Sequence, residues 1–218
     1  MAAAVARHGW PTLRLARRAI NEYGALQRTW ELMSLVGAVR RLVPRTVVEI
    51  GTHRGGTLFC WAAAAHPAAH LVSIDIPNPA EGMGATGADD ARLRRVLGPA
   101  QSLTCLRSDS HAPETRAALV RALAGRAVDF LWIDGDHSYQ GVRSDFEMYA
   151  PLVRPGGLIA FHDILPNPAL PGNQVRPFWD EVRQGFEHSE LVDQDHPGGV
   201  GMGIGILVQR APASPPGA

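Results

Sequence analysis

The 218-residue chain contains no lysine, so all 21 of its basic residues are arginine, and 21 acidic residues balance them. Binding to a phosphate backbone requires a surplus of clustered positive charge, which a formal net charge of zero does not supply. The missing lysine also excludes the Gly-Lys-Ser/Thr phosphate loop and any lysine general base. We therefore expect no nucleic-acid partner, and we expect histidine or an acid to accept protons in any reaction.

Cysteine and long apolar runs are also scarce. Cys60 and Cys105 stand in apolar stretches without the CxxC or Cys/His spacing of a zinc site, which predicts buried thiols. The longest apolar run, residues 58–65, is far shorter than the roughly 20 residues that span a bilayer, and the first residues lack the apolar core of a secretory signal. We therefore expect a soluble, cytoplasmic protein without membrane contact.

Short apolar runs alternate with helical segments along the chain. Runs that are apolar at almost every position are typical of strands covered on both faces of a parallel sheet. Six such runs are present, at residues 46–50, 71–74, 102–106, 128–133, 157–161 and 203–208. Five segments between them have helical character, at residues 58–65, 89–97, 113–123, 141–152 and 175–186. The alternation predicts a doubly wound α/β fold.

The segments that flank this pattern differ from it. Apolar residues at spacings of three and four between residues 13 and 42 predict one or two amphipathic helices that pack on the sheet or on a partner. We expect an N-terminal helical extension over residues 1–45, one α/β domain over residues 46–210 and a disordered tail over residues 211–218. The Gly- and Pro-rich stretch at residues 77–88 has no apolar period, which favours a lid or binding loop.

A strand, a glycine-rich turn and a helix are predicted in VVEIGTHRGGTLFCWA, residues 47–62. Gly51, Gly55 and Gly56 allow a ligand to approach the backbone, and the helix behind them offers free N–H groups. Asp75 ends the next strand, where an acid can accept hydrogen bonds from both hydroxyls of a ribose. The pattern indicates a ligand that contains adenosine. The alternative is a generic α/β turn whose glycines only relieve crowding.

The spacing of the glycines narrows the choice of nucleotide. Three residues separate Gly51 from Gly55, which differs from the GxGxxG fingerprint and argues against a nicotinamide-dependent oxidoreductase, the alternative enzyme class. Glu49 suits a cationic ligand better than a pyrophosphate, because a carboxylate attracts a sulfonium and an amino group. The motif E-I-G-x-x-x-G-G-T resembles motif I of class I S-adenosylmethionine-dependent methyltransferases.

This resemblance implies that S-adenosylmethionine is the cofactor. The residues that would hold it lie at the ends of four strands and are Glu49, Gly51, Thr52, Gly55, Gly56, Asp75, Asp109 and Asp134. Asp109 stands where such enzymes commonly contact adenine, and its alternative role is that of a turn acid before Pro113. His111 has no partner visible in the sequence and is expected at the surface.

The segment FLWIDGDHSYQGVRSDFEMYAPLVRPGGLIAFHDI, residues 130–164, places acids and histidines after two neighbouring strands. These residues are Asp134, Asp136, His137, His162 and Asp163. Open α/β sheets bind ligands at this edge, and uncompensated charge there would be costly. The segment therefore implies a bound cation or a substrate.

The motifs IDGDHSY and PGGLIAFHD resemble a methyltransferase family that includes sugar O-methyltransferases of antibiotic and cell-wall glycoside pathways and proteins related to cephalosporin hydroxylase. The resemblance covers residues 46–208. It implies a Rossmann-like fold with a mostly parallel seven-stranded sheet and an antiparallel last strand. It also implies a homo-oligomer that transfers a methyl group to a hydroxyl of a small molecule, with a glycosylated natural product as the favoured acceptor. The alternative within the family is an accessory protein related to cephalosporin hydroxylase.

Carried over residue by residue, the resemblance implies that Asp134, His162 and Asp163 bind a divalent metal, magnesium or manganese. Related enzymes often have an acid or an amide in place of His162, and a nitrogen ligand favours manganese, iron or zinc over magnesium. The alternative is a hydrogen-bonded network without metal. His137 stands where related sugar methyltransferases place a general base, and an imidazole suits that role. Asp136 is the alternative base, and His137 would then be a turn residue.

Overall fold

A computed structural model of the chain describes residues 2–77, 87–168, 170–193 and 201–211. The predicted lid at residues 77–88 lies outside these ranges except at its ends. The predicted tail at residues 211–218 lies outside them except at its first residue.

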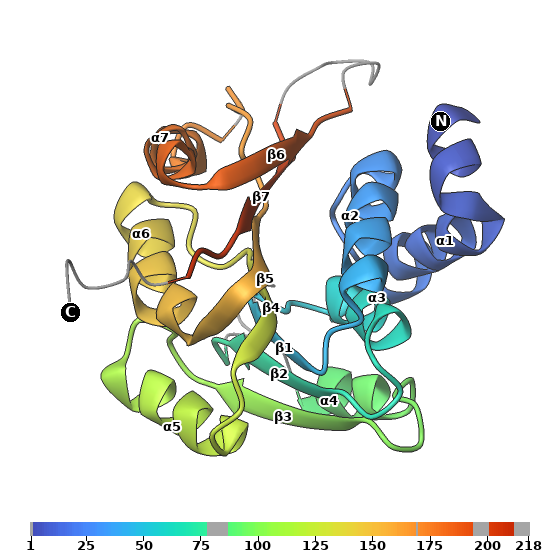
Figure 1. Cartoon of the computed structure of the whole chain (residues 1–218), viewed down its shortest axis with the longest axis horizontal. Helices are drawn as coiled ribbons and strands as arrows, with labels where there is room; N and C mark the ends of the chain where they lie inside the picture. The colour runs from blue at the N-terminus through green and yellow to red at the C-terminus, as the bar shows by residue number, and fades with distance from the viewer. Residues whose placement is uncertain (1, 78–86, 169, 194–200, 212–218) are drawn as a thin grey trace.

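Seven strands form one sheet in the order β3-β2-β1-β4-β5-β7-β6 (Figure 1). Their bounds are β1 Thr46–Ile50, β2 His70–Asp75, β3 Ser102–Arg107, β4 Val128–Ile133, β5 Val153–Phe161, β6 Glu187–Leu191 and β7 Ile204–Val208. Neighbours from β3 to β5 pair in parallel, and β7 runs antiparallel to both β5 and β6. The predicted mostly parallel sheet with an antiparallel last strand is confirmed. The sequence pattern missed β6, because its residues are mostly polar and exposed and no apolar run marks them.

Helices cover both faces of the sheet. Their bounds are α1 Ala2–Tyr23, α2 Thr29–Leu42, α3 Gly56–Ala64, α4 Gly87–Arg94, α5 Pro113–Leu123, α6 Tyr139–Tyr149 and α7 Val175–Val182. Helices α1 to α4 share one apolar cluster and α5 to α7 the other, on opposite sides of the sheet (Figure 1). Alternate strand residues serve the two clusters, as Trp132 and Leu131 of β4 illustrate. The doubly wound fold thus follows from strands that are apolar on both faces.

The N-terminal helices pack on the α/β domain. The ring of Tyr23 at the end of α1 stacks on Phe59 of α3, with 4.3 Å between ring centroids. The guanidinium of Arg92 lies 4.5 Å from the centroid of the Tyr23 ring and donates hydrogen bonds to the carbonyls of Glu22 and Arg54. The predicted extension therefore contributes directly to the core beside the glycine-rich turn.

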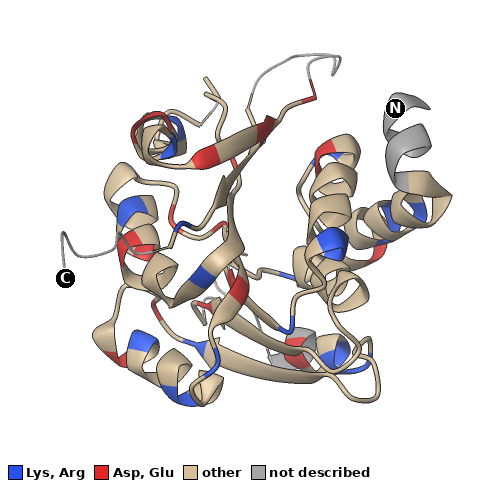
Figure 2. Cartoon of the chain, in the orientation of Figure 1, with Lys and Arg blue, Asp and Glu red and all other residues tan. Residues whose placement is uncertain are grey.

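The cysteines and charges agree with a folded domain of mixed surface. Cys60 is buried, Cys105 is half-buried, both are free thiols, and burial raises the pKa of each. Figure 2 shows basic and acidic positions interspersed over the helices on both sides of the sheet. Within the described part of the chain, no helix combines the length and apolar character needed to cross a bilayer.

Candidate functional site

The register of the parallel strands brings chain segments together at one edge of the sheet. Ile133 of β4 pairs with Ile50 of β1 on one side and with Phe161 of β5 on the other. The residues that follow these strands therefore leave the sheet at the same level: Gly51, Asp134 and His162. This is the carboxyl edge at which open α/β sheets bind ligands.

The three glycines after β1 are required by close packing of the chain itself. Gly51 has φ +81°, and a Cβ there would lie 1.9 Å from the carbonyl oxygen of Asp134. A Cβ on Gly56 would lie 2.3 Å from the backbone nitrogen of Ala25, and one on Gly55 would overlap a leucine of α4. Neighbouring segments of the protein thus approach these glycines. This agrees with the alternative interpretation, in which the glycines of the turn relieve crowding. Because Gly51 has no side chain, the backbone of Asp134 can pack directly against the end of β1.

The acid at the end of β2 lies beside this turn. The backbone N–H of His53 donates a hydrogen bond of 2.5 Å to Oδ2 of Asp75. Burial raises the pKa of the Asp75 carboxyl, and that hydrogen bond opposes the rise. Thr52 is buried, with its hydroxyl 2.6 Å from that of Ser73. Asp75 therefore lies at the end of β2 beside the glycine-rich turn, and the hydroxyl of Thr52 is used within the protein.

Glu49 faces the layer of α3 and is completely buried. Its Oε1 accepts a hydrogen bond of 2.6 Å from the hydroxyl of Thr57 at the start of α3. Burial raises the pKa of the Glu49 carboxyl well above its ordinary value, and the charges of Asp134 and Asp75 add to the rise. The predicted cofactor residue thus lies beneath the turn rather than at its surface.

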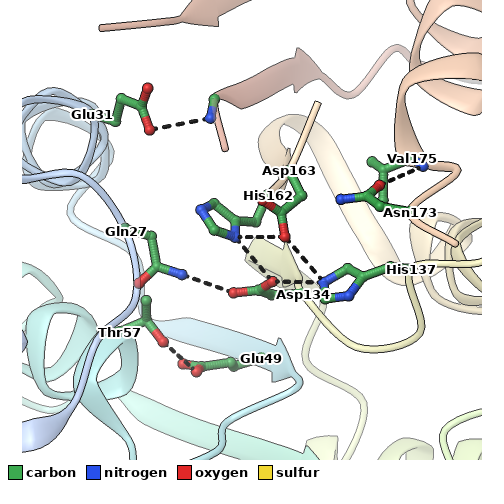
Figure 3. Close-up of polar contacts among 11 residues, drawn as sticks. Gln27, Glu31, Glu49, Thr57, Asp134, His137, His162, Asp163, Asn173 and Val175 are labelled. Carbon is green, nitrogen blue, oxygen red and sulfur yellow. Dashed lines mark hydrogen bonds and ion pairs between the residues drawn. The ribbon is translucent and has the colours of Figure 1, made fainter. Parts of the chain in front are cut away.

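Two carboxylates and two imidazoles form the centre of the site (Figure 3). Oδ1 of Asp134 lies 3.2 Å from Nδ1 of His162 and 3.4 Å from Nε2 of His137. Oδ2 of Asp163 lies 3.4 Å from the same nitrogen of His162 and 3.3 Å from that of His137. Asp163 has φ +58°, and this turn after β5 directs its carboxylate towards both rings. The structure therefore brings together four of the five residues that the segment predicted.

The charges of this group are strongly coupled. Burial lowers the pKa of His162, but the charge of Asp134 and hydrogen bonds to Asp134 and Asp163 raise it overall to about 10. The hydrogen bond to Asp134 raises the pKa of His137 against the effect of burial. Burial raises the pKa of Asp163, and its interactions with His162 and His137 bring it below the ordinary value. Two adjacent carboxylates at this depth require a positive charge, from an imidazolium or from a bound cation.

Asp136 and Asp109 lie outside this group. Oδ1 of Asp136 accepts a hydrogen bond of 2.8 Å from the backbone N–H of Ser138, and the residue is exposed at the start of α6. Oδ1 of Asp109 accepts one of 2.9 Å from the backbone N–H of His111, and its side chain is 63% exposed. In this structure both acids stabilise turns, which is the alternative interpretation of Asp109.

Two contacts between segments far apart in the sequence were not predicted. Nε2 of Gln27, in the turn between α1 and α2, donates a hydrogen bond of 2.8 Å to Oδ2 of Asp134. Nε2 of His111 lies 3.4 Å from Oδ1 of Asp145, which is completely buried on α6, and the pKa of His111 rises to about 9 because of this contact. His111, expected at the surface, is half-buried and has a partner that was not visible in the sequence. A sequence signal existed for Asp145, since it shares the buried face of α6 with apolar residues, but none existed for Gln27.

The donor set of the central group fits a divalent cation. One ligand atom from each of Asp134, His162 and Asp163 lies within 4.8 Å of the others. Nδ1 of His162 faces the carboxylates, whereas its Nε2 is buried and has no hydrogen-bond partner among the described residues. Two carboxylates and one imidazole suit manganese, iron or zinc better than magnesium, which prefers oxygen ligands.

Curated relatives match parts of the chain. The uncharacterized protein y4gI of Sinorhizobium fredii is 32% identical over 134 residues, which cover 60% of this chain and 14% of that protein. The uncharacterized protein R132 of Acanthamoeba polyphaga mimivirus is 53% identical over 36 residues, 16% of each protein. The matched segments thus span less than a fifth of the length of either relative.

Solved structures share the fold over nearly the whole chain. The O-methyltransferase TomG of Streptomyces achromogenes, in complex with S-adenosylmethionine, is 21% identical with a TM-score of 0.60, covering 91% of this chain and 89% of that one. An O-methyltransferase of Bacillus cereus, in complex with S-adenosylhomocysteine, is 16% identical with a TM-score of 0.57 and the same coverages. The mycinamycin methyltransferase MycE, in complex with magnesium and S-adenosylhomocysteine, is 17% identical with a TM-score of 0.58, covering 91% of this chain and 54% of that one.

The family described as "Methyltransferase domain" matches residues 48–164, more than half of the chain. The match begins in β1 and ends just after Asp163, so it contains the glycine-rich turn and the acid–histidine group. The chain therefore belongs to the methyltransferase domain family.

Proposed function

We propose that the protein transfers the methyl group of S-adenosylmethionine to a hydroxyl oxygen of a small molecule. The observation that carries this proposal is the group of two carboxylates and two imidazoles at the carboxyl edge of a methyltransferase sheet. A sugar of a glycosylated natural product is the favoured acceptor. Its support is the family resemblance, together with the structural likeness to methyltransferases of tomaymycin synthesis and mycinamycin biosynthesis.

The cofactor would lie across the ends of β2, β1 and β4. Asp75 would bind the ribose hydroxyls, and Asp109, exposed after β3, is the candidate contact for adenine. The backbone from Gly51 to Gly56 would line the cofactor between them. Glu49 would act through its negative charge from beneath the turn, since a sulfonium above it would counter the burial that raises its pKa. The residues fit such a cofactor, because buried acids at three strand ends suit a cationic nucleoside.

The chemistry is one in-line displacement at carbon. When bound, S-adenosylmethionine would supply the methyl group: the acceptor oxygen would bond to the methyl carbon as the carbon–sulfur bond breaks with its electron pair going to sulfur, and a base of this chain would take the hydroxyl proton. His137 is the base we assign, because its ring lies beside both carboxylates and keeps about a third of its surface exposed. A divalent cation held by Asp134, His162 and Asp163 would polarise the hydroxyl and lower its pKa. Positioning of the two reactants supplies most of the remaining acceleration.

Product mass and cofactor binding test the function. The purified protein, incubated with S-adenosylmethionine and sugar-bearing acceptors, should add one methyl group to an acceptor. His137→Ala should lower kcat by about 10²-fold or more, the typical contribution of a general base, while binding S-adenosylhomocysteine as the parent does. His188→Ala is the matched control, because His188 is an exposed histidine of β6. Unchanged turnover in His137→Ala would remove the base assignment, and absence of turnover with every acceptor would favour an accessory protein.

Metal dependence has its own test. Dialysis against EDTA should abolish turnover, and manganese should restore it better than magnesium. His162→Asp, which replaces the nitrogen ligand by oxygen, should shift that preference towards magnesium. Full activity after EDTA dialysis, with no metal detected in the protein, would leave the hydrogen-bonded network as the explanation of the group.

A further inference from the structure

Gln27 is the one described residue of the α1–α2 turn that hydrogen-bonds to Asp134, and only 5% of its surface is exposed. Its Nε2 donates to Oδ2 of Asp134, whereas its Oε1 is buried without a hydrogen-bond donor among the described residues. An amide oxygen buried without a donor costs roughly 1–3 kcal/mol. This orphaned acceptor is therefore a feature that needs an explanation.

The orientation of the amide is determined by Asp134. Exchange of the amide nitrogen and oxygen would place Oε1 against a carboxylate oxygen and replace a hydrogen bond by repulsion. Oε1 of Gln27 is therefore held near the Asp134 carboxylate, on the side of the amide that does not make the hydrogen bond to Asp134. Figure 3 shows the Gln27 side chain beside Asp134, with Thr57 and Glu49 drawn below it. The backbone of Ala25 touches Gly56, which places this turn directly over the start of α3.

The surroundings of Oε1 favour a cationic donor. The carboxylate of Asp134, which receives the hydrogen bond from Nε2, accepts hydrogen bonds when it is ionised and cannot donate one to Oε1. Asp134 keeps 14% of its side chain exposed and the neighbouring Leu26 is 60% exposed, so the region lies close to the surface. A ligand group that enters here should carry positive charge and N–H donors.

Three groups of S-adenosylmethionine carry N–H or O–H donors. In the proposed binding mode, the ribose hydroxyls would bind Asp75 at the end of β2, and the adenine amino group would lie further along the sheet edge, towards β3. The α-ammonium of the methionine part remains, and it is the cationic one. The sulfonium has no hydrogen to donate, and the methionine carboxylate would be repelled by Asp134.

We propose that Gln27 binds the α-ammonium group of the cofactor through Oε1 while Nε2 holds Asp134 in place. This inference rests on the proposed function, because it requires that the cofactor be S-adenosylmethionine. It makes the N-terminal extension part of the cofactor site, with one amide joining the methionine end of the cofactor to the acid–histidine group.

The test compares two ligands on matched variants by isothermal titration calorimetry. S-Adenosylhomocysteine carries the ammonium, whereas 5′-methylthioadenosine has the same nucleoside and sulfur but lacks the amino acid. Gln27→Leu and Gln27→Met remove the amide with little change of volume. Gln101→Leu is the control, because Gln101 is a half-buried glutamine away from the site, and its Nε2 donates a hydrogen bond of 2.8 Å to the carbonyl of Ala62. Thermal melting establishes that each variant is folded.

A hydrogen bond to a charged group contributes about 1.5–3 kcal/mol. Gln27→Leu and Gln27→Met should therefore weaken S-adenosylhomocysteine about 10- to 100-fold and leave 5′-methylthioadenosine within about twofold of the parent. Gln101→Leu should change neither. Equal weakening of both ligands, or of neither, in the folded Gln27 variants overturns the proposal while leaving the function intact. A parent protein that binds neither ligand refutes the proposed function itself.

Discussion

Replacing His111 by alanine should destabilise the protein more than replacing its partner Asp145 by asparagine. Asp145 is completely buried, and neither of its oxygens accepts a hydrogen bond from the described residues. Its contact with Nε2 of His111, at 3.4 Å, is the ion pair that compensates its charge. Loss of one partner from a buried pair costs about 3–5 kcal/mol, a large part of the 5–15 kcal/mol that stabilises a typical domain.

The difference between the two variants follows from the solvent exposure of the side chain that each substitution leaves unpaired. His111→Ala leaves a carboxylate in the core, whereas Asp145→Asn leaves an imidazole whose side chain is 30% exposed and can lose its proton to solvent. We therefore expect a loss of about 3–5 kcal/mol for the first variant and about 1–2 kcal/mol for the second. The double variant, which has no buried charge, should be closer to Asp145→Asn than to the sum of both.

The pH dependence provides an independent measurement. The pKa of His111 is about 9 in the folded chain and about 6.5 in an unfolded one, so its protonated form is favoured by folding. The stabilisation is fully present below pH 6.5 and is lost as the pH rises through 9. Because the imidazole is partly exposed, solvent screening reduces the change to roughly 1–2 kcal/mol.

Chemical denaturation followed by circular dichroism at pH 6 and pH 10 measures these differences. His111→Ala should differ from the parent more at pH 6 than at pH 10. A loss below 1 kcal/mol at pH 6, or a loss that is the same at both pH values, would show that Asp145 is compensated by something other than the charge of His111.

Two further substitutions test the packing around the site. Gly51→Ala should cost more than 3 kcal/mol of folding stability, because its Cβ would lie 1.9 Å from the Asp134 carbonyl oxygen. Gly125→Ala should cost about 1 kcal/mol, because Gly125 has φ +80°, close to the +81° of Gly51, and its Cβ would meet no atom of the described residues within 4 Å. Thermal melting compares them, and equal losses would show that φ alone matters. Glu31→Ala should accelerate amide hydrogen exchange at Gly203, whose N–H donates to the Glu31 carboxylate at 3.2 Å. Unchanged exchange would mean that another acceptor replaces that carboxylate.

The layered fold could be predicted from sequence because its signals are local. The apolar runs that became β1 and β4 have the same bounds in the structure as in the prediction, since strands buried on both faces have few polar positions. The antiparallel β6 escaped prediction, because a polar edge strand has no apolar run. Acids and histidines at strand ends could likewise be predicted to meet, because the carboxyl ends of parallel strands share one edge.

The tertiary structure alone decided which side chains complete the site. Gln27 and Asp134 are 107 residues apart, and their contact depends on how the α1–α2 turn packs over α3. His111 and Asp145 are in contact because the loop after β3 lies against α6, and the sequence around neither residue indicates this contact. The glycines after β1 were predicted correctly as a turn, but only packing showed that Gly51 makes room for the Asp134 backbone. Periodicity reports which face of an element is buried, whereas contacts between distant segments depend on the packing of the whole chain.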